Sequence, residues 1–600
     1  MPDAVRHSVS PVSPLGRTVR RRFTTYNHQH VERSSVPGAH IIAYLVSFLF
    51  PCKAAEAQLR PWRRATTQLN EVSSLQDINS LSAILDRGES AGDAVVVLGS
   101  AALNADSNNM LVVSNEASTV AAGSAEVNSL TPTPPEPNQG PKVTTLEIPG
   151  TVSASGVRPD YTSQDSSFAT YVSICLHGLR SCAQALRVDT AGYDDNIRDL
   201  GSFIVSHHSK KLAAKINTIR YMWFKRETDD APPPVRLCDW KPSTSAEQDE
   251  DFVFPDDPQF SYYLDRNPAF SKRPVPQQPS QSQRVVAARD SIAFPNTLLS
   301  LLNSLERYLD RQSFAAAAQA LATMHVFVQS IPVQFWRSHG TMQIFSEIDY
   351  DFEDLRHVAV PVNESSIDSD EWIPESCKQF IRSFDSLCSV VSATQYLTQR
   401  QAFYAPVPFN VSVISTSIGA TLEIPSQAVE VRAVVEHWYK GNQISKIDIS
   451  LLYDEITNNL NIRGSCHCEA SILAALLTED SSEDMREVNP TLFPGDRVIG
   501  LSKKPCPICY CLCEVLNVQH DLKVSLPSPH KVYSTWIPPA WLPVYDLGQL
   551  EARLLEKLRA MCSLIADHDK SRTLPPASSD SDIHHPWFAS ADGPITIDLE

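Results

Sequence analysis

The chain has 600 residues, a length that predicts two or three folded units. Of these residues 42% are hydrophobic and 20% are charged, which is typical of a soluble globular protein. Its formal net charge of −18 argues against a broad, non-specific grip on nucleic acid, which depends on lysines and arginines that displace phosphate counterions. Thirteen cysteines in so long a chain do not make a disulfide framework, so we expect an intracellular, reducing compartment, cytoplasmic or nuclear.

Residues 1–60 are expected to form a basic, largely disordered N-terminus. Up to His40 this segment is rich in arginine and has only Asp3 and Glu32 as acids. The apolar run 41–50 is shorter than the about 20 residues of a membrane helix, and it lies late for a secretory signal, so no membrane association is expected. A mitochondrial presequence is the alternative interpretation.

Two segments of different character follow. Residues 61–99 are expected to be helical, since Leu75, Ile78 and Leu81 recur at helical spacing. Residues 100–155 are rich in Ser, Asn, Thr and Ala and contain four prolines within 131–137, which predicts a disordered linker.

The middle of the chain is predicted to be an all-α module. Apolar stripes at three- and four-residue spacing predict helices in 156–228 and 291–405. Between them, 229–290 contains Pro232–Pro234 and a Pro/Gln/Ser tract, and it is predicted to be a second disordered linker. We expect this module to bind a protein partner or to guide targeting.

The pattern changes at Val407, where apolar and polar residues begin to alternate as in half-buried strands. Strand patterns then alternate with helical ones through 406–545, which predicts an α/β domain with functional loops at strand ends. A C-terminal helix is expected over 546–570 and a disordered tail over 571–600.

Three residues of the 406–545 domain have the types and spacing of the ligands of a catalytic metal site. His467, Cys506 and Cys509 offer one imidazole and two thiolates, and a catalytic zinc has three such ligands plus an open position for water. Each half of the set precedes a predicted helix, whose N-terminus favours thiolates. The sequence therefore predicts a Zn²⁺ cofactor held by these three residues.

Glu469 lies two positions after His467 and is the predicted catalytic residue. From there it can reach a zinc-bound water without binding the metal, so it can act as a proton shuttle. Zinc lowers the pKa of that water toward about 7, which supplies zinc-bound hydroxide near neutral pH.

The pair of motifs His467-Cys468-Glu469-Ala470 and Pro505-Cys506-Pro507-Ile508-Cys509 resembles the zinc-dependent cytidine deaminase-like superfamily, in particular a fungal and bacterial branch of predicted deaminases. The resemblance covers about 407–542. It implies a three-layer α/β fold, a mixed sheet with helices on both faces. It also implies hydrolytic deamination of cytosine or adenine in a nucleic acid or nucleotide.

Other readings stay open on the sequence alone. Cys466, Cys468, Cys506 and Cys509 are able to form a closed four-thiolate site, which would make the protein a non-catalytic, zinc-stabilised interaction protein. A deaminase acting on free nucleosides is a further alternative. Cys511 and Cys513 are predicted to be buried packing residues.

Candidate substrate contacts lie in the loops and short strands around the metal motifs. Lys504 flanks the metal loop and is a candidate for a phosphate, and His530 and Trp536 are candidates for stacking on a base. Asn410 is a candidate for reading a ring edge. For each of them a plain packing or solvated role is the alternative.

Overall fold

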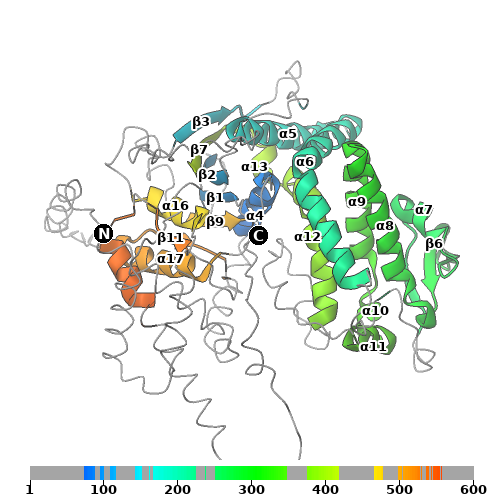
Figure 1. The fold of residues 1–600 in the computed structure, drawn as a ribbon. Coiled ribbons are helices and arrows are strands. Elements are labelled where there is room, and N and C mark those ends of the chain that lie inside the picture. The colour runs from blue at the N-terminus through cyan, green and yellow to red at the C-terminus, as the bar shows by residue number, and fades with distance from the viewer. Residues whose placement is uncertain are drawn as a thin grey trace, which may run out of the picture.

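The computed structural model describes residues 73–87, 95–100, 108–116, 142–151, 161, 167–188, 190–224, 237, 250–347, 375–417, 465–477, 497–502, 505–527, 529, 536–539, 542–543, 545–554 and 556. Its main parts are a mixed six-stranded sheet and a bundle of long helices beside it (Figure 1). Among the described helices, none has the length and apolar character needed to cross a membrane. The predicted segments 1–60 and 571–600 lie outside the described residues.

The six-stranded sheet takes its strands from distant parts of the chain. They are β1 (Val95–Ser100), β2 (Asn108–Glu116), β3 (Lys142–Ile148), β7 (Phe409–Ser417), β9 (Arg497–Leu501) and β10 (Val524–Ser525), in the spatial order β10-β9-β1-β2-β7-β3. Strand β1 is antiparallel to both of its neighbours, whereas β2 is parallel to β7 and β9 is parallel to β10. The fold class is therefore mixed α/β, as expected.

Strand β1 is buried on both faces. Alternate residues of a strand point to opposite sides of the sheet. In β1, Val95 and Val97 enter one hydrophobic core, and Val96 and Leu98 enter another. The first core also holds helix α4 (Ser73–Leu85) and the long helices, and the second holds α16 (Cys468–Ala475) and α17 (Pro507–His520). Helices thus cover the sheet on both sides (Figure 1).

The long helices form a module on the first face. They are α5 (Phe168–Val188), α6 (Thr190–Ile219, continued by a π-helical turn Arg220–Phe224), α8 (Ala293–Asp310), α9 (Phe314–Ser330), α10 (Val333–Arg337), α11 (His339–Glu347), α12 (Glu375–Thr398) and α13 (Gln401–Tyr404). Their apolar stripes share one continuous core with α4 and with the sheet. The module is therefore packed onto the sheet as part of the same folded body.

A small antiparallel sheet lies at the far side of the module. Its strands β4 (Phe252–Pro255), β6 (Gln278–Val286) and β5 (Ser271–Val275) are accompanied by the short helix α7 (Pro258–Leu264) and a 3-10 turn at Ala288–Asp290. The buried Asp256 carboxylate accepts hydrogen bonds from Arg284 Nε at 2.6 Å and Ser282 Oγ at 2.8 Å. This buried charged pair ties β6 to the turn that begins α7.

Three segment predictions are wrong in part. The linker predicted over 100–155 contains β2 and β3, and the linker predicted over 229–290 contains the small sheet. Helical structure in 61–99 includes α4, but the segment ends in β1. The reason is that the apolar runs at 95–98 and 110–113 are only four residues long and stand among Ser and Asn, so average composition conceals them.

The α/β sheet is also not confined to 406–545, since β1, β2 and β3 come from the first 150 residues. Within 406–545 the strand predicted near 411–415 is β7, and the one predicted over 497–501 is β9. The predicted helix and strand between 418 and 464 lie outside the described residues. Residues 545–554 are helical, in agreement with the start of the predicted C-terminal helix.

Glycine is required at one close contact of the sheet. Gly500 in β9 lies against the backbone of α4, where an added Cβ would be 2.6 Å from the Asn79 nitrogen and would also meet Ile78. The backbone atoms of α4 cannot move away from an added Cβ, whereas the end of a flexible side chain could. The absence of a side chain at Gly500 therefore allows α4 to lie directly on the sheet.

We predict that Gly500→Ala lowers the free energy of unfolding by at least about 2 kcal/mol, because the methyl group forces α4 away from β9. The matched control is Gly548→Ala in the C-terminal helix, where an added Cβ meets nothing within 4 Å. That change should stabilise the helix by roughly 0.5–1 kcal/mol. Urea unfolding of both variants measures the difference, and equal stability of the two would contradict the close contact.

Candidate metal centre

Two helix starts carry the predicted ligands. His467 is the N-cap of α16 and Cys506 is the N-cap of α17, and both have extended backbone angles. Their carbonyl oxygens accept the first helical hydrogen bonds, from Ser471 N at 3.0 Å and Tyr510 N at 3.0 Å. Pro507 begins α17, a position where the missing N–H costs nothing. The local sequence thus places each ligand at the first turn of a helix.

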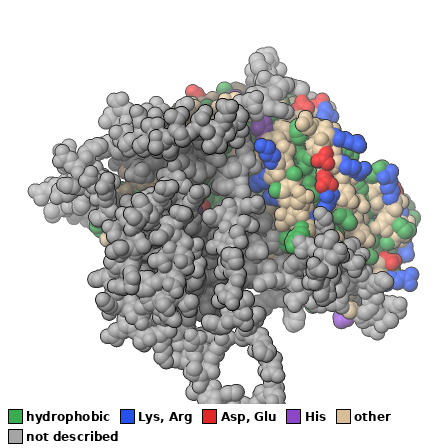
Figure 2. Space-filling view, in the orientation of Figure 1, with side chains coloured by type: hydrophobic (Ala, Val, Ile, Leu, Met, Phe, Trp, Pro, Cys, Tyr) green, Lys and Arg blue, Asp and Glu red, His purple; other side chains and the backbone are tan. Residues whose placement is uncertain are grey.

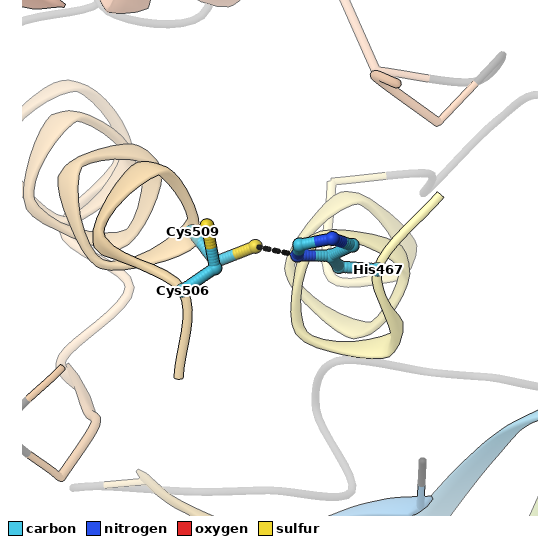
Figure 3. A group of neighbouring side chains, drawn as sticks. All are labelled: His467, Cys506 and Cys509. Carbon is cyan, nitrogen blue, oxygen red and sulfur yellow. Dashed lines mark hydrogen bonds between the residues drawn. The ribbon is translucent and has the colours of Figure 1, made fainter. Parts of the chain in front are cut away.

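The three predicted ligands meet in space. One donor atom of each of His467, Cys506 and Cys509 lies within 4.8 Å of the other two. The side chains point toward one another from α16 and α17, with His467 Nδ1 3.5 Å from Cys509 Sγ (Figure 3). In the part of the chain that the structure describes, this is the group of His, Cys, Asp and Glu side chains arranged to hold a metal ion.

The donor set fits zinc. Usual Zn–N and Zn–S bond lengths in a tetrahedral site place an imidazole nitrogen and a thiolate sulfur about 3.6 Å apart, close to the observed 3.5 Å. One nitrogen and two sulfurs are ligands that zinc prefers, and three protein ligands leave a fourth position open. The chemistry and the spacing of these three residues are therefore compatible with a zinc ion.

The two thiols are strongly buried. Cys509 is 0% exposed, and this burial, reinforced by the neighbouring Cys506, Glu469 and Cys466, raises the pKa of its thiol well above the usual value. A thiol in such surroundings stays protonated at neutral pH when no cation is near. A divalent cation reverses that preference, because a coordinating thiol loses its proton. Metal binding at this site is therefore expected to release protons.

The other cysteines of the stretch do not join the metal group. Cys466 is at the end of β8 (Ser465–Cys466), with its Sγ 3.3 Å from Ser471 Oγ, and burial raises its pKa to about 11. Cys468, Cys511 and Cys513 are buried in the second core. Among the described residues, the donor atoms within reach of one another are therefore those of His467, Cys506 and Cys509.

Glu469 lies in the first turn of α16, two residues after His467. Its side chain is buried, at 8% exposure, and it lies near enough to Cys466 and Cys509 for its charge to raise the pKa of both thiols. It is not a member of the metal-ligand group. A buried carboxylate beside the ligands, but outside their set, has the placement that a proton carrier needs.

The structure describes two of the four predicted substrate contacts, Asn410 and Trp536. Asn410 is the second residue of β7, and its side-chain amide N–H donates to Asn109 Oδ1 at 3.0 Å. Trp536, on β11 (Trp536–Ile537), is fully buried in the second core, and β11 pairs with β8. Lys504 and His530 lie outside the described residues. Substrate roles for all four stay predictions.

One contact near the centre has no signal in the sequence. Asn79 of α4 accepts a hydrogen bond from the Leu501 backbone N–H at 3.0 Å, at the end of β9 that leads to Cys506. The two residues are separated by 422 positions. A single asparagine on a helix carries no pattern that predicts such a partner.

A comparison with known protein families finds one match in the region that holds these residues. Residues 466–540 match the model of the OTT_1508-like deaminase family, and this interval includes the three metal ligands and Glu469. No curated protein and no solved structure matches the chain. The segment that holds the candidate metal-ligand group is therefore similar to deaminases of this family.

Proposed function

We propose that the protein catalyses zinc-dependent hydrolytic deamination of a nucleobase, cytosine or adenine, in a nucleic acid or a nucleotide. The observation that carries this proposal is the group His467, Cys506 and Cys509, with Glu469 buried beside it, inside the interval that matches a deaminase family. The match supports deamination in general. The residues of the site supply the mechanism.

The three ligands would hold zinc with one position open to solvent or substrate. When bound, zinc lowers the pKa of a water molecule and so supplies a nucleophile near neutral pH. Glu469 would carry one proton of the attacking water to the ring nitrogen, and would then carry the second proton of that water to the amino group, which leaves as ammonia. Its burial keeps the carboxylate in the dry first turn of α16, where the helix N-terminus favours a negative charge.

The sheet on which α16 and α17 rest supports a deaminase-like, three-layer domain. Strands β1, β2 and β9 lie under both helices in the second core, and the first core covers their other face. In this proposal the catalytic domain is discontinuous: its sheet includes strands from 95–148 as well as from 409–525.

The proposed substrate class follows from the chemistry of the metal centre and not from a binding surface on the helical module. Figure 2 shows Lys and Arg interspersed with Asp and Glu over the visible face of the helical module. A broad basic surface is therefore not what attracts a polynucleotide to that face. Recognition of a base within a nucleic acid or nucleotide is assigned to the loops around the metal centre, and a protein partner of the module is a further part of the proposal.

The metal-ligand assignment predicts which cysteines matter. Cys506→Ser and His467→Ala should lose zinc, measured as metal per folded chain after gel filtration, because each removes one of three ligands. Cys466→Ser should retain zinc, since Cys466 lies outside the group. Loss of zinc in Cys466→Ser, together with retention in His467→Ala, would instead establish the four-thiolate site.

The role of Glu469 predicts a separation of binding from turnover. Glu469→Gln should keep its zinc and lower the rate of ammonia release by at least about 100-fold, because the amide cannot carry the proton. The assay compares single-stranded DNA, RNA, nucleotides and free nucleosides with zinc-loaded protein. Release of ammonia from free nucleosides alone would favour that narrower substrate class. An inactive zinc-loaded wild type would favour the non-catalytic interaction protein.

A further inference from the structure

Helix α4 lies between the helical module and the strand that leads to the metal centre. One side of it packs on β1 and β9, and another side packs on α12 and α5. Since α4 precedes all six strands in the chain, its place beside β9 is maintained by contacts alone. The contacts on its two sides are made by neighbouring residues of one helical turn.

On the side of the sheet, α4 contacts the last residues of β9. The Asn79 side chain accepts the Leu501 N–H at 3.0 Å, and Gly500 allows the backbones to approach closely. The next residue, Ser502, is tied to β1 by two hydrogen bonds with Val95, each 3.2 Å long. The end of β9 is therefore held from two directions.

On the side of the module, Asp77 accepts a hydrogen bond from a residue of α12 and forms an ion pair with Arg400, the N-cap of α13. Tyr396 Oη donates to Asp77 Oδ1 at 2.8 Å, and Arg400 Nε lies 2.7 Å from the same oxygen. Asp77 is only 5% exposed, whereas the Arg400 side chain is 34% exposed, so the pair is shielded from water on the side of the carboxylate. The module therefore fixes the same turn of α4 that carries Asn79.

The held strand end leads directly to a metal ligand. Cys506 follows Leu501 by five residues and is the N-cap from which α17 starts. A catalytic ligand set must be held to within about 0.5 Å, and a strand end is a more exact support than a free loop. Since five positions separate Leu501 from Cys506, a shift of Leu501 is expected to displace the start of α17.

We propose that α4 couples the helical module to the metal centre, and that Asn79 is a positioning residue for the metal ligand Cys506. The Asn79–Leu501 hydrogen bond fixes the end of β9, and the Asp77 contacts with α12 fix Asn79. The proposal rests on the metal centre of the proposed function, but it concerns metal binding and not turnover.

The alternative is that Asn79 is an ordinary packing contact that contributes to stability alone. In that case its loss lowers the free energy of unfolding, and the folded fraction binds metal as before. A positioning role instead changes the metal site of protein that is still folded. Metal affinity and ligand geometry, measured well below the unfolding transition, separate these two cases.

The test measures Co²⁺ binding, since thiolate-bound cobalt absorbs visible light in a way that reports its geometry. Asn79→Leu removes the acceptor and should weaken metal binding by about tenfold and alter the cobalt spectrum. Asn79→Asp keeps an oxygen acceptor for Leu501 and should restore both. The matched control is Asn303→Leu on α8, which removes the acceptor of Arg220 Nη2 and touches neither α4 nor β9.

Each result has one meaning. Wild-type affinity and spectrum in folded Asn79→Leu would overturn the positioning role while leaving the metal centre intact. An equal loss in Asn303→Leu would show general destabilisation, and it would also overturn the role. A wild-type protein that binds no cobalt at His467, Cys506 and Cys509 would overturn the proposed function itself.

The part of the proposal that concerns the module is tested by Tyr396→Phe, which removes one donor to Asp77. As a single change, Tyr396→Phe should weaken cobalt binding by about twofold. In the Asn79→Leu background it should cause no further loss of cobalt affinity, because both changes act through the same turn of α4. Additive effects, or no effect of Tyr396→Phe in either background, would show that the module does not act on the centre through α4.

Discussion

The burial of β1 on both faces is the constraint on which the rest of the structure depends. Its residues alternate between two cores, one shared with the helical module and the other with the helices that carry the metal ligands. A strand with water on one side could not be built from Val95-Val96-Val97-Leu98 without exposing apolar area. The module and the metal helices are therefore both required to cover this strand.

At the metal centre, burial and ligand chemistry oppose each other until a cation is present. Burial raises the pKa of the Cys509 thiol, and Glu469 adds a negative charge nearby. The cost of placing these groups together is offset when a divalent cation binds, because coordination favours the thiolates. Without a cation, the buried thiols and the neighbouring carboxylate destabilise one another. With a cation, the same groups act as its ligands and neighbours, which is a physical reason to regard them as a metal site.

What the sequence predicts well is local, and what it misses is distant. His467, Cys506, Cys509 and the helices that follow them are encoded within a few residues by caps and motif spacing. The strands β1 and β2 are short apolar runs that pair with each other, and the second partner of each lies hundreds of residues away. Periodicity alone does not distinguish such runs from other segments. Asn79 has no predictive pattern at all, since its partner is a backbone N–H in another part of the chain.

The helical module enters and leaves the sheet at one place, and this explains how so large a segment is tolerated there. Ile148, the end of β3, pairs with Phe409, the start of β7. Arg180 of α5 fixes the junction: it donates to Val407 O at 2.6 Å and stacks 4.2 Å from the Phe409 ring. Because the entry and exit strands are adjacent, the module can be accommodated between them without a change in the register of the sheet. The proposed coupling of the module to the metal centre therefore relies on side-chain contacts such as those of α4.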